Sequence, residues 1–213
     1  MSASAASPRG ALIVIAAPSG AGKTTLVHAL LRQMPELRFS VSYTTRKPRP
    51  KETDGVDYFF VDGNEFRRMA GAGELLEHAL VFDHWYGTGK AHVEALRAAG
   101  HTVLLEIDWQ GTAQVRQKAP DARTIFIVPP SLAALEERLH GRGTDSEAVI
   151  ARRLSDSVGD LKHWNEFDYI VVNDDVATAV RELAAIVAGG GAANRRDAPG
   201  IRARIGRLLA GAG

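Results

Sequence analysis

The stretch that decides the fold is Ile13-Val14-Ile15-Ala16-Ala17-Pro18-Ser19-Gly20-Ala21-Gly22-Lys23-Thr24-Thr25. An apolar run leads into a glycine-rich turn, and apolar residues at helical spacing follow it. This order of strand, loop and helix is the context that a phosphate-binding loop of the pattern G-x-x-x-x-G-K-[ST] requires, and only Ala17 departs from the pattern. Glycines let successive N–H groups point at a phosphate, and the helix N-terminus adds its dipole. The stretch therefore predicts a binding site for a nucleoside triphosphate.

Two side chains of this loop carry the expected chemistry. Lys23 brings a positive charge to the β- and γ-phosphates. The hydroxyl of Thr24 can ligate Mg²⁺. We expect the whole loop to contact the nucleotide, through Pro18, Ser19, Gly20, Ala21, Gly22, Lys23, Thr24 and Thr25.

Length and composition limit the class of protein. The chain has 213 residues, 45% hydrophobic and 24% charged, so we expect a soluble globular protein with a substantial core. A net charge of +1 gives no reason to expect nucleic acid or a membrane as partner, and no apolar run reaches the roughly 18–20 residues that span a bilayer. The absence of cysteine excludes disulfides and fits a reducing, cytoplasmic compartment. Residues 1–10 are expected to be a disordered leader.

Strand and helix patterns alternate in the second half of the chain. Apolar runs at 103–107, 124–128 and 169–172 predict buried strands. Helical patterns separate and follow them, at about 111–118 and 131–140, in a long helix to about 163, and at 175–188. This alternation predicts an α/β fold, a three-layer P-loop core with a parallel sheet.

Residues 39–88 interrupt the alternation with short β-prone pieces, so we expect a separate β-rich lobe there. Within it, Asp62 and Glu65 have the spacing of a capping box that opens a helix. A further helix is expected at about 90–99. Residues 189–194 are glycine-rich and predict a flexible linker, followed by a short basic helix at about 201–210.

The loop alone does not choose among nucleotide-binding families. A regulatory GTPase needs Asn-Lys-x-Asp to read guanine, and the chain has only Asn173-Asp174-Asp175, so we reject that class. The chain instead resembles guanylate kinases over about residues 11–188, through motifs that occur in the order of that family. Besides the loop these are Val41-Ser42-Tyr43-Thr44-Thr45-Arg46-Lys47-Pro48-Arg49, Gly55-Val56-Asp57-Tyr58-Phe59-Phe60, Glu77, Tyr86-Gly87-Thr88, Asp108-Trp109-Gln110-Gly111, Pro129-Pro130-Ser131, Gly141-Arg142-Gly143 and Ile170-Val171-Val172-Asn173-Asp174-Asp175.

The resemblance implies a kinase that transfers phosphate from ATP, with Mg²⁺, to GMP and dGMP. The core would comprise residues 11–38 and 89–188, the GMP-binding lobe about 39–88 and a small helical lid about 138–155. Residues 189–213 lie beyond this domain, as a linker and helix.

The inserted lobe would hold GMP. By resemblance, Arg46 and Arg49 bind its phosphate with the hydroxyls of Tyr58 and Tyr86, and guanidinium forks match phosphate oxygens.

Four other residues of the chain would recognise the guanine base. The resemblance makes Glu77 and Asp108 the guanine readers, while Ser42 and Thr88 supply hydroxyls. Guanine presents N1–H and N2–H₂ donors, which a carboxylate accepts, whereas adenine presents an acceptor at N1.

The lid would bring cations to the transferred group. The resemblance assigns Arg138, Arg142 and Asn173 to ATP and makes Lys23, Arg46, Arg142 and Arg153 the catalytic set. Glu106 stands where the family usually has Asp, and we expect at most an outer-shell role near Mg²⁺. Arg97 and Arg152 are expected on solvated helix faces.

Two other hypotheses stay open. One is a guanylate-kinase-like module without catalysis that binds phosphopeptides, which Lys23, Thr24 and the lid arginines argue against. The other is a kinase of another nucleoside monophosphate, which Ser42, Glu77 and Asp108 argue against. A homo-oligomer is compatible with the sequence, which does not determine the oligomeric state.

Overall fold

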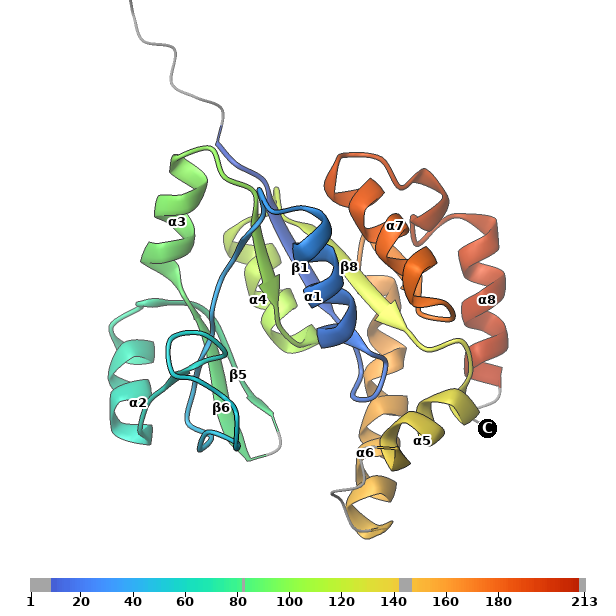
Figure 1. Ribbon diagram of the computed structural model, residues 1–213, viewed down its shortest axis with the longest axis horizontal. Coiled ribbons are helices and arrows are strands. Elements are labelled where there is room, and N and C mark those ends of the chain that lie inside the picture. Colours follow the sequence, from blue (N-terminus) through green and yellow to red (C-terminus); the bar gives the residue numbers. More distant parts are fainter. Residues whose placement is uncertain (1–8, 82, 142–146, 211–213) are drawn as a thin grey trace, which may run out of the picture. The chain divides into compact units, whose positions relative to one another are not determined.

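The computed structural model describes residues 9–81, 83–141 and 147–210, in two compact units whose elements are drawn in Figure 1. The first unit comprises residues 1–14 and 35–122, and the second comprises 15–34 and 123–213. Strand β1, Leu12–Ala16, belongs to both, because the boundary follows Val14. No helix in the described ranges has the length and apolar character needed to cross a bilayer.

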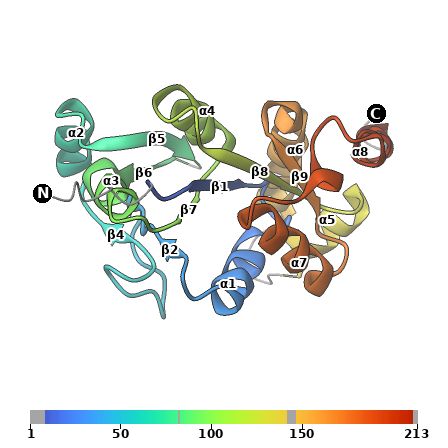
Figure 2. The same cartoon turned by 90° about the horizontal axis from the view of Figure 1, so that it is seen from above.

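The second unit has three layers. Strands β8 (Arg123–Val128) and β9 (Tyr169–Val172) pair in parallel, and the strand order is β1-β8-β9. Figure 2 shows α1 (Lys23–Gln33) and α7 (Val176–Val187) side by side on one face of these strands, with α6 (Glu147–Leu161) on the other. Since helices cover both faces, the strands read as continuous apolar runs, as parallel strands do. This confirms the expected α/β core with a parallel sheet.

Within the described part of the second unit there are four further helical elements. Their bounds are α5 (Leu132–His140), the 3₁₀ helices η1 (Lys162–Glu166) and η2 (Ala192–Asn194), and α8 (Pro199–Ala210). The long helix expected to reach residue 163 therefore ends two residues earlier and continues as η1. Short 3₁₀ segments are common at helix ends.

The first unit contains the other edge of the parallel strands. Here β2 (Arg38–Phe39) pairs in parallel with β7 (Val103–Glu106), in the order β2-β7-β1. Helices α3 (Lys90–Ala98) and α4 (Trp109–Lys118) contribute Val93 and Val115 to the core that these strands share. The remaining core side chains of this cluster include Leu12, Val14, Leu76, Val103, Leu105 and Ile107.

A second sheet lies within the first unit and corresponds to the β-rich lobe that the sequence predicted. Its four strands run in the order β4 (Phe59–Phe60), β3 (Tyr43–Thr44), β6 (His84–Gly89) and β5 (Leu75–Val81). The pairs β3–β6 and β6–β5 are antiparallel, and Glu77 lies opposite Thr88. Phe66 and Met69 of α2 (Gly63–Gly71) pack on Leu75 of this sheet.

Two predicted details at chain connections differ from the structure. Asp62 caps α2 as expected, and its carboxylate accepts from the N–H groups of Asn64 and Glu65. The Glu65 side chain, however, binds Arg68 instead of closing a capping box. Residues 189–194, expected as a flexible linker, end in the buried Asn194, whose amide donates to the Ile170 carbonyl at 3.1 Å.

Arg97 corrects a further expectation, because it is buried and not on a solvated helix face. Its side chain is 1% exposed. Its Nε donates to the Gly10 carbonyl at 3.0 Å, and its Nη2 donates to the Asp121 carboxylate. The Gly10 N–H in turn donates to the Arg97 carbonyl at 2.8 Å. Arg97 therefore fixes Gly10, which the sequence placed in the leader, against α3.

We expect Asp121→Asn to lower the free energy of unfolding by about 1–3 kcal/mol, because the buried guanidinium of Arg97 loses its charged partner. The Asp121 side chain is 64% exposed, which keeps the loss below that of a fully buried pair. Urea denaturation measures the effect. The control is Asp197→Asn, which breaks an exposed pair with Arg195 and should change nothing measurable. Equal losses in the two variants would contradict this assignment.

Candidate active site

The glycine-rich loop lies in the second unit, between the end of β1 at Ala16 and the start of α1 at Lys23. Gly20 and Gly22 have φ angles of +83° and +90°, in the left-handed region that side chains rarely adopt. Gly22 is the N-cap of α1, which places Lys23 and Thr24 in the first helical turn. An anion at this end of the helix would be bound by backbone N–H groups and favoured by the helix dipole. The predicted phosphate loop is therefore built as its sequence requires.

Asn173 supports the loop from behind. Its side chain is 3% exposed, and Nδ2 donates to the Ala21 carbonyl at 2.7 Å. A Cβ atom at Gly22 would lie 2.4 Å from that Nδ2, so the close approach of Asn173 needs glycine there. The carbonyl of Asn173 accepts from Arg138 Nη2 of α5 at 2.9 Å. Two of the three residues outside the loop that the resemblance assigns to ATP, Arg138 and Asn173, thus contact each other, and Asn173 contacts the loop.

Two buried polar atoms of this group have no hydrogen-bond partner within the described ranges, namely Asn173 Oδ1 and Arg138 Nη1. Such atoms are costly unless a ligand or water satisfies them. The two other arginines expected in the lid, Arg142 and Arg153, add little to the description of the site. Arg153 is half-buried on α6, and Arg142 lies outside the described residues.

Sequence reasoning missed Ser157 of α6. Its side chain is fully buried and its Oγ donates to the Ser19 carbonyl of the loop at 3.0 Å. Ile150, Leu154 and Leu161 share its helix face at spacings of three and four. A single polar residue in that apolar stripe was the signal that could have found it.

The expected guanine readers meet in the first unit. Glu77 of β5 is 2% exposed, and its Oε1 accepts from the Thr88 hydroxyl of β6 at 2.6 Å. Asp108 is the N-cap of α4, and its Oδ1 accepts from the Gly111 N–H at 2.8 Å. A Cβ at Gly111 would lie 2.3 Å from Glu77 Oε2 and 3.2 Å from Asp108 Oδ1, so both carboxylates approach the same glycine. Ser42 is buried immediately before β3.

The surroundings of Glu77 oppose its ionisation. The pKa of Glu77 is raised from 4.5 to about 7, mainly by burial and also by the charge of Asp108. The Thr88 hydroxyl and the ammonium of Lys118 act in the opposite direction. A ligand that donates hydrogen bonds to this carboxylate would favour its charged form, which makes the site selective for a donor edge.

The expected phosphate ligands form a second cluster in the same unit. The guanidinium of Arg46 donates to both carboxylate oxygens of Glu52, at 2.8 and 2.9 Å, and lies 5.3 Å from the centre of the Tyr58 ring. The Tyr58 and Tyr86 rings are 5.8 Å apart, and Glu52 and Tyr86 are among the groups that raise the pKa of Arg46. Burial is the main cause that raises the pKa of Tyr58 to about 12, and the charge of Glu106 adds to it. The structure thus brings Arg46, Tyr58 and Tyr86 together.

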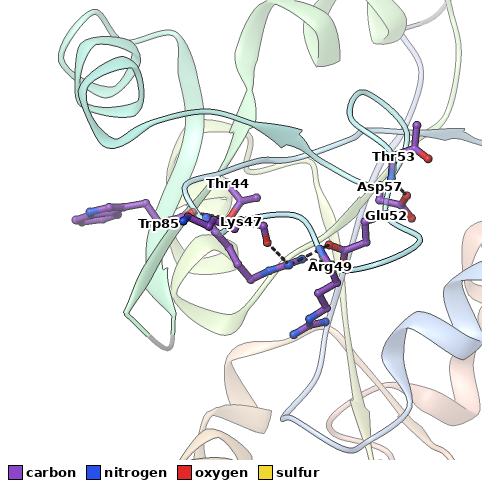
Figure 3. Close-up of polar contacts among 8 residues, drawn as sticks. Thr44, Lys47, Arg49, Glu52, Thr53, Asp57 and Trp85 are labelled. Atoms are coloured by element: carbon purple, nitrogen blue, oxygen red, sulfur yellow. Dashed lines mark hydrogen bonds and ion pairs between the residues drawn. The ribbon is translucent and has the colours of Figure 1, made fainter. Parts of the chain in front are cut away.

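Glu52 is a member of this cluster that sequence reasoning missed. Besides holding Arg46, it accepts from the backbone N–H of Arg49 at 2.7 Å. Figure 3 shows the Arg49 side chain extending away from Glu52, where it is exposed. The carboxylate holds Arg46 in the bidentate geometry that phosphate also takes. The spacing of three between Arg46, Arg49 and Glu52 was the signal in the sequence.

No cluster of three or more His, Asp or Glu side chains that could hold a metal occurs in the described ranges. Glu106, at the end of β7, has Tyr58 as a charge neighbour within the first unit. Its predicted outer-shell role near a metal stays a prediction.

Comparisons with known proteins agree with this geometry. The sequence profile of the family described as guanylate kinase matches residues 9–189. A guanylate kinase of Nitrosococcus oceani is 51% identical over 200 residues, which are 94% of this chain and 98% of that protein. One of Salmonella typhimurium is 47% identical over 204 residues, 95% of this chain and 99% of that protein. The crystal structure of guanylate kinase from Anaplasma phagocytophilum has a TM-score of 0.73 and 33% identity, covering 86% of this chain and 87% of that one.

The pKa of Glu77 predicts how stability depends on pH. Its folded-state pKa of about 7 lies above the ordinary 4.5, so its favourable contribution is present below pH 4.5 and is lost as pH rises through 7. Glu77→Gln cannot ionise and escapes that loss. Relative to the parent, we expect the variant to gain on the order of 3 kcal/mol between pH 4.5 and pH 8. Urea denaturation across this range tests it, and a pH-independent difference between the two proteins would contradict it.

Gly22→Ala should disrupt the phosphate loop, since the new Cβ would meet Asn173 and the backbone would be strained. We expect about 1–3 kcal/mol less stability and at least roughly 10-fold weaker ATP binding. Calorimetry with ATP and thermal unfolding measure the two effects. Gly159→Ala is the matched control on α6, because nothing lies within 4 Å of its Cβ position, and it should keep both properties or gain stability.

Proposed function

The chain belongs to the guanylate kinase family, and we propose on that premise that it transfers the γ-phosphoryl group of ATP to the phosphate of GMP or dGMP. The products are ADP and GDP or dGDP. The main support for GMP as the substrate is the buried carboxylate of Glu77, which lies close to Thr88 and Asp108. The same chain also has a phosphate-binding loop.

Each unit would bind one nucleotide. In the second unit, the loop N–H groups and Lys23 would hold the β- and γ-phosphates of ATP, with Asn173 and Arg138 beside them. In the first unit, Arg46, Arg49, Tyr58 and Tyr86 would hold the phosphate of GMP. The half-buried Arg153 would neutralise charge on the group in transfer.

The phosphoryl transfer does not need a side chain that acts as a general base. An oxygen of the GMP phosphate, already anionic, attacks the γ-phosphorus and forms a new P–O bond, while the bond from that phosphorus to the β–γ bridging oxygen breaks and ADP leaves. Catalysis then consists of holding the two phosphates in line and neutralising their charge, which is what Lys23 and the arginines would supply.

The donor set of the loop suits magnesium. Thr24 places a hydroxyl in the first turn of α1, and Mg²⁺ in such sites takes one or two protein oxygens and completes its shell with phosphates and water. Thr24 would therefore hold the ion, which supplies charge neutralisation at the β- and γ-phosphates when bound.

Base choice would follow from hydrogen-bond polarity. Guanine offers two donors, N1–H and N2–H₂, to a carboxylate that is buried and already accepts from Thr88. Adenine would place its N1 acceptor against that carboxylate, so both groups would be left unpaired. Within this family, nothing in the site favours a non-catalytic binding module, since Lys23 and Thr24 stand in a correctly built loop.

A coupled assay with ATP and each of GMP, dGMP, AMP, UMP and CMP tests the activity. We expect turnover with the two guanine nucleotides, and a loss on the order of 10²-fold or more in kcat for Lys23→Ala, because Lys23 contacts charge that develops in the transition state. Lys162→Ala, an exposed lysine of η1, is the control and should keep kcat. Preference for AMP, UMP or CMP over the two guanine nucleotides, or full kcat in folded Lys23→Ala, would refute the proposal.

A further inference from the structure

Helix α4 holds the backbone of β5 on both sides of Glu77. The Gln114 side chain uses both of its polar atoms on His78, since Nε2 donates to the carbonyl at 2.6 Å and Oε1 accepts from the N–H at 3.2 Å. Lys118 Nζ donates to the Leu76 carbonyl at 2.6 Å. The two residues that flank the carboxylate are thus anchored to one helix.

The contacts come from one face of α4. Gly111, Gln114 and Lys118 follow each other at spacings of three and four, which places them in line along the helix. At Gly111 the face has no side chain, and there it approaches the Glu77 carboxylate so closely that a Cβ would lie 2.3 Å away. One helix face therefore sets both the distance of the carboxylate and the position of the strand that carries it.

The position of β5 in its sheet explains why such anchors are needed. In the order β4-β3-β6-β5 it is an edge strand, so among the described residues one side of its backbone has no partner strand in that sheet. Hydrogen bonds from α4 satisfy backbone groups of Leu76 and His78 on this open side of the strand. Apart from side-chain packing, the backbone near Glu77 is otherwise held by its pairing with β6, where Glu77 lies opposite Thr88.

Charge gives Lys118 a second effect on the same carboxylate. The groups that face Glu77 are Thr88 from β6, and Asp108 and Lys118 from α4. Lys118 is the positive one, and it lowers the pKa of Glu77 against the effects of burial and Asp108. A positive charge here would keep the carboxylate an acceptor.

We propose that Gln114 and Lys118 are positioning residues for guanine recognition, which act through β5 to place the Glu77 carboxylate against the donor edge of the base. Neither residue needs to touch the nucleotide. The inference rests on the proposed function, because it takes Glu77 as the guanine reader.

The test compares Gln114→Leu and Lys118→Met with a matched control, Gln117→Leu, on an exposed position of the same helix. Lys118→Arg keeps the charge and a donor, and Lys118→Gln keeps a donor without the charge. For each folded protein, kcat and KM are measured for GMP, for IMP, which lacks the 2-amino group, and for ATP, and the GMP values are measured from pH 5.5 to 8.5.

We expect Gln114→Leu and Lys118→Met to raise KM for GMP about 10-fold, with KM for ATP within about twofold of the parent. The preference for GMP over IMP should fall, because a displaced carboxylate no longer accepts both donors. Lys118→Met and Lys118→Gln should move the acidic limb of kcat/KM for GMP to higher pH, since the ionised form of Glu77 loses a favourable charge. Lys118→Arg should restore both, and Gln117→Leu should behave as the parent.

A purely structural role predicts a different pattern, in which the active fraction falls equally for every substrate, KM and the GMP-to-IMP ratio stay constant and the pH limb does not move. That result overturns the proposal. If Lys118→Met does not fold, Lys118→Gln decides it by the same pH limb. Calorimetric titration with GMP measures binding without turnover, so a parent that binds GMP but does not phosphorylate it refutes the proposed function while still testing the positioning role.

Discussion

A carboxylate buried in an apolar setting is the constraint around which the first unit is arranged. Glu77 is 2% exposed, and a buried acid is costly unless donors or positive charge compensate it. The protein supplies the Thr88 hydroxyl from across the sheet and the ammonium of Lys118. Because residue 111 is glycine, the first turn of α4, which is the positive end of the helix dipole, can approach the Glu77 carboxylate closely. The compensation is incomplete, so donors from a bound ligand would further stabilise the charged form.

Other parts of the candidate site follow the same principle, since protein partners hold Arg46 and the backbone of the glycine-rich loop. Arg46 is held by Glu52 and lies over the Tyr58 ring, so its guanidinium group is already ordered in the absence of a phosphate. In the second unit, Asn173 and Ser157 bind carbonyls of the glycine-rich loop, which fixes the backbone whose N–H groups would bind ATP. Preorganisation of this kind lowers the cost of ordering side chains and loops on binding. It also explains why glycine is needed at Gly22 and Gly111, where a Cβ would collide with the supporting side chain.

The sequence alone predicted whatever depends on local pattern. The glycine-rich loop and the buried parallel strands follow from turn chemistry and periodicity, and the bounds of these strands agree with the structure to within a few residues. Phe39 differs, because it was expected in the β-rich lobe and instead lies in β2, which pairs with β7 of the parallel sheet. What sequence reasoning missed depends on partners distant in the chain. The burial of Arg97 requires Gly10 and Asp121, and the anchoring of β5 requires Gln114 and Lys118, residues about 36 to 42 positions away from their acceptors. From the sequence alone, polar residues on a helix are interpreted as solvent-exposed, because the strand that they bind in the fold is not known. The resemblance supplied the roles of single residues, because no spacing rule assigns Glu77 to guanine.

In the proposed function, Glu77 is a carboxylate whose charged form is stabilised by the donors of a guanine base. Carbon-13 NMR of protein labelled at the glutamate carboxyl groups observes it directly, with the Glu77 signal identified by its absence in Glu77→Gln. We expect this signal to titrate near pH 7 in the free protein. Saturating GMP should lower the pKa so that the group is ionised at pH 6, while ATP should leave it unchanged. A Glu77 signal whose titration GMP does not alter would contradict the account.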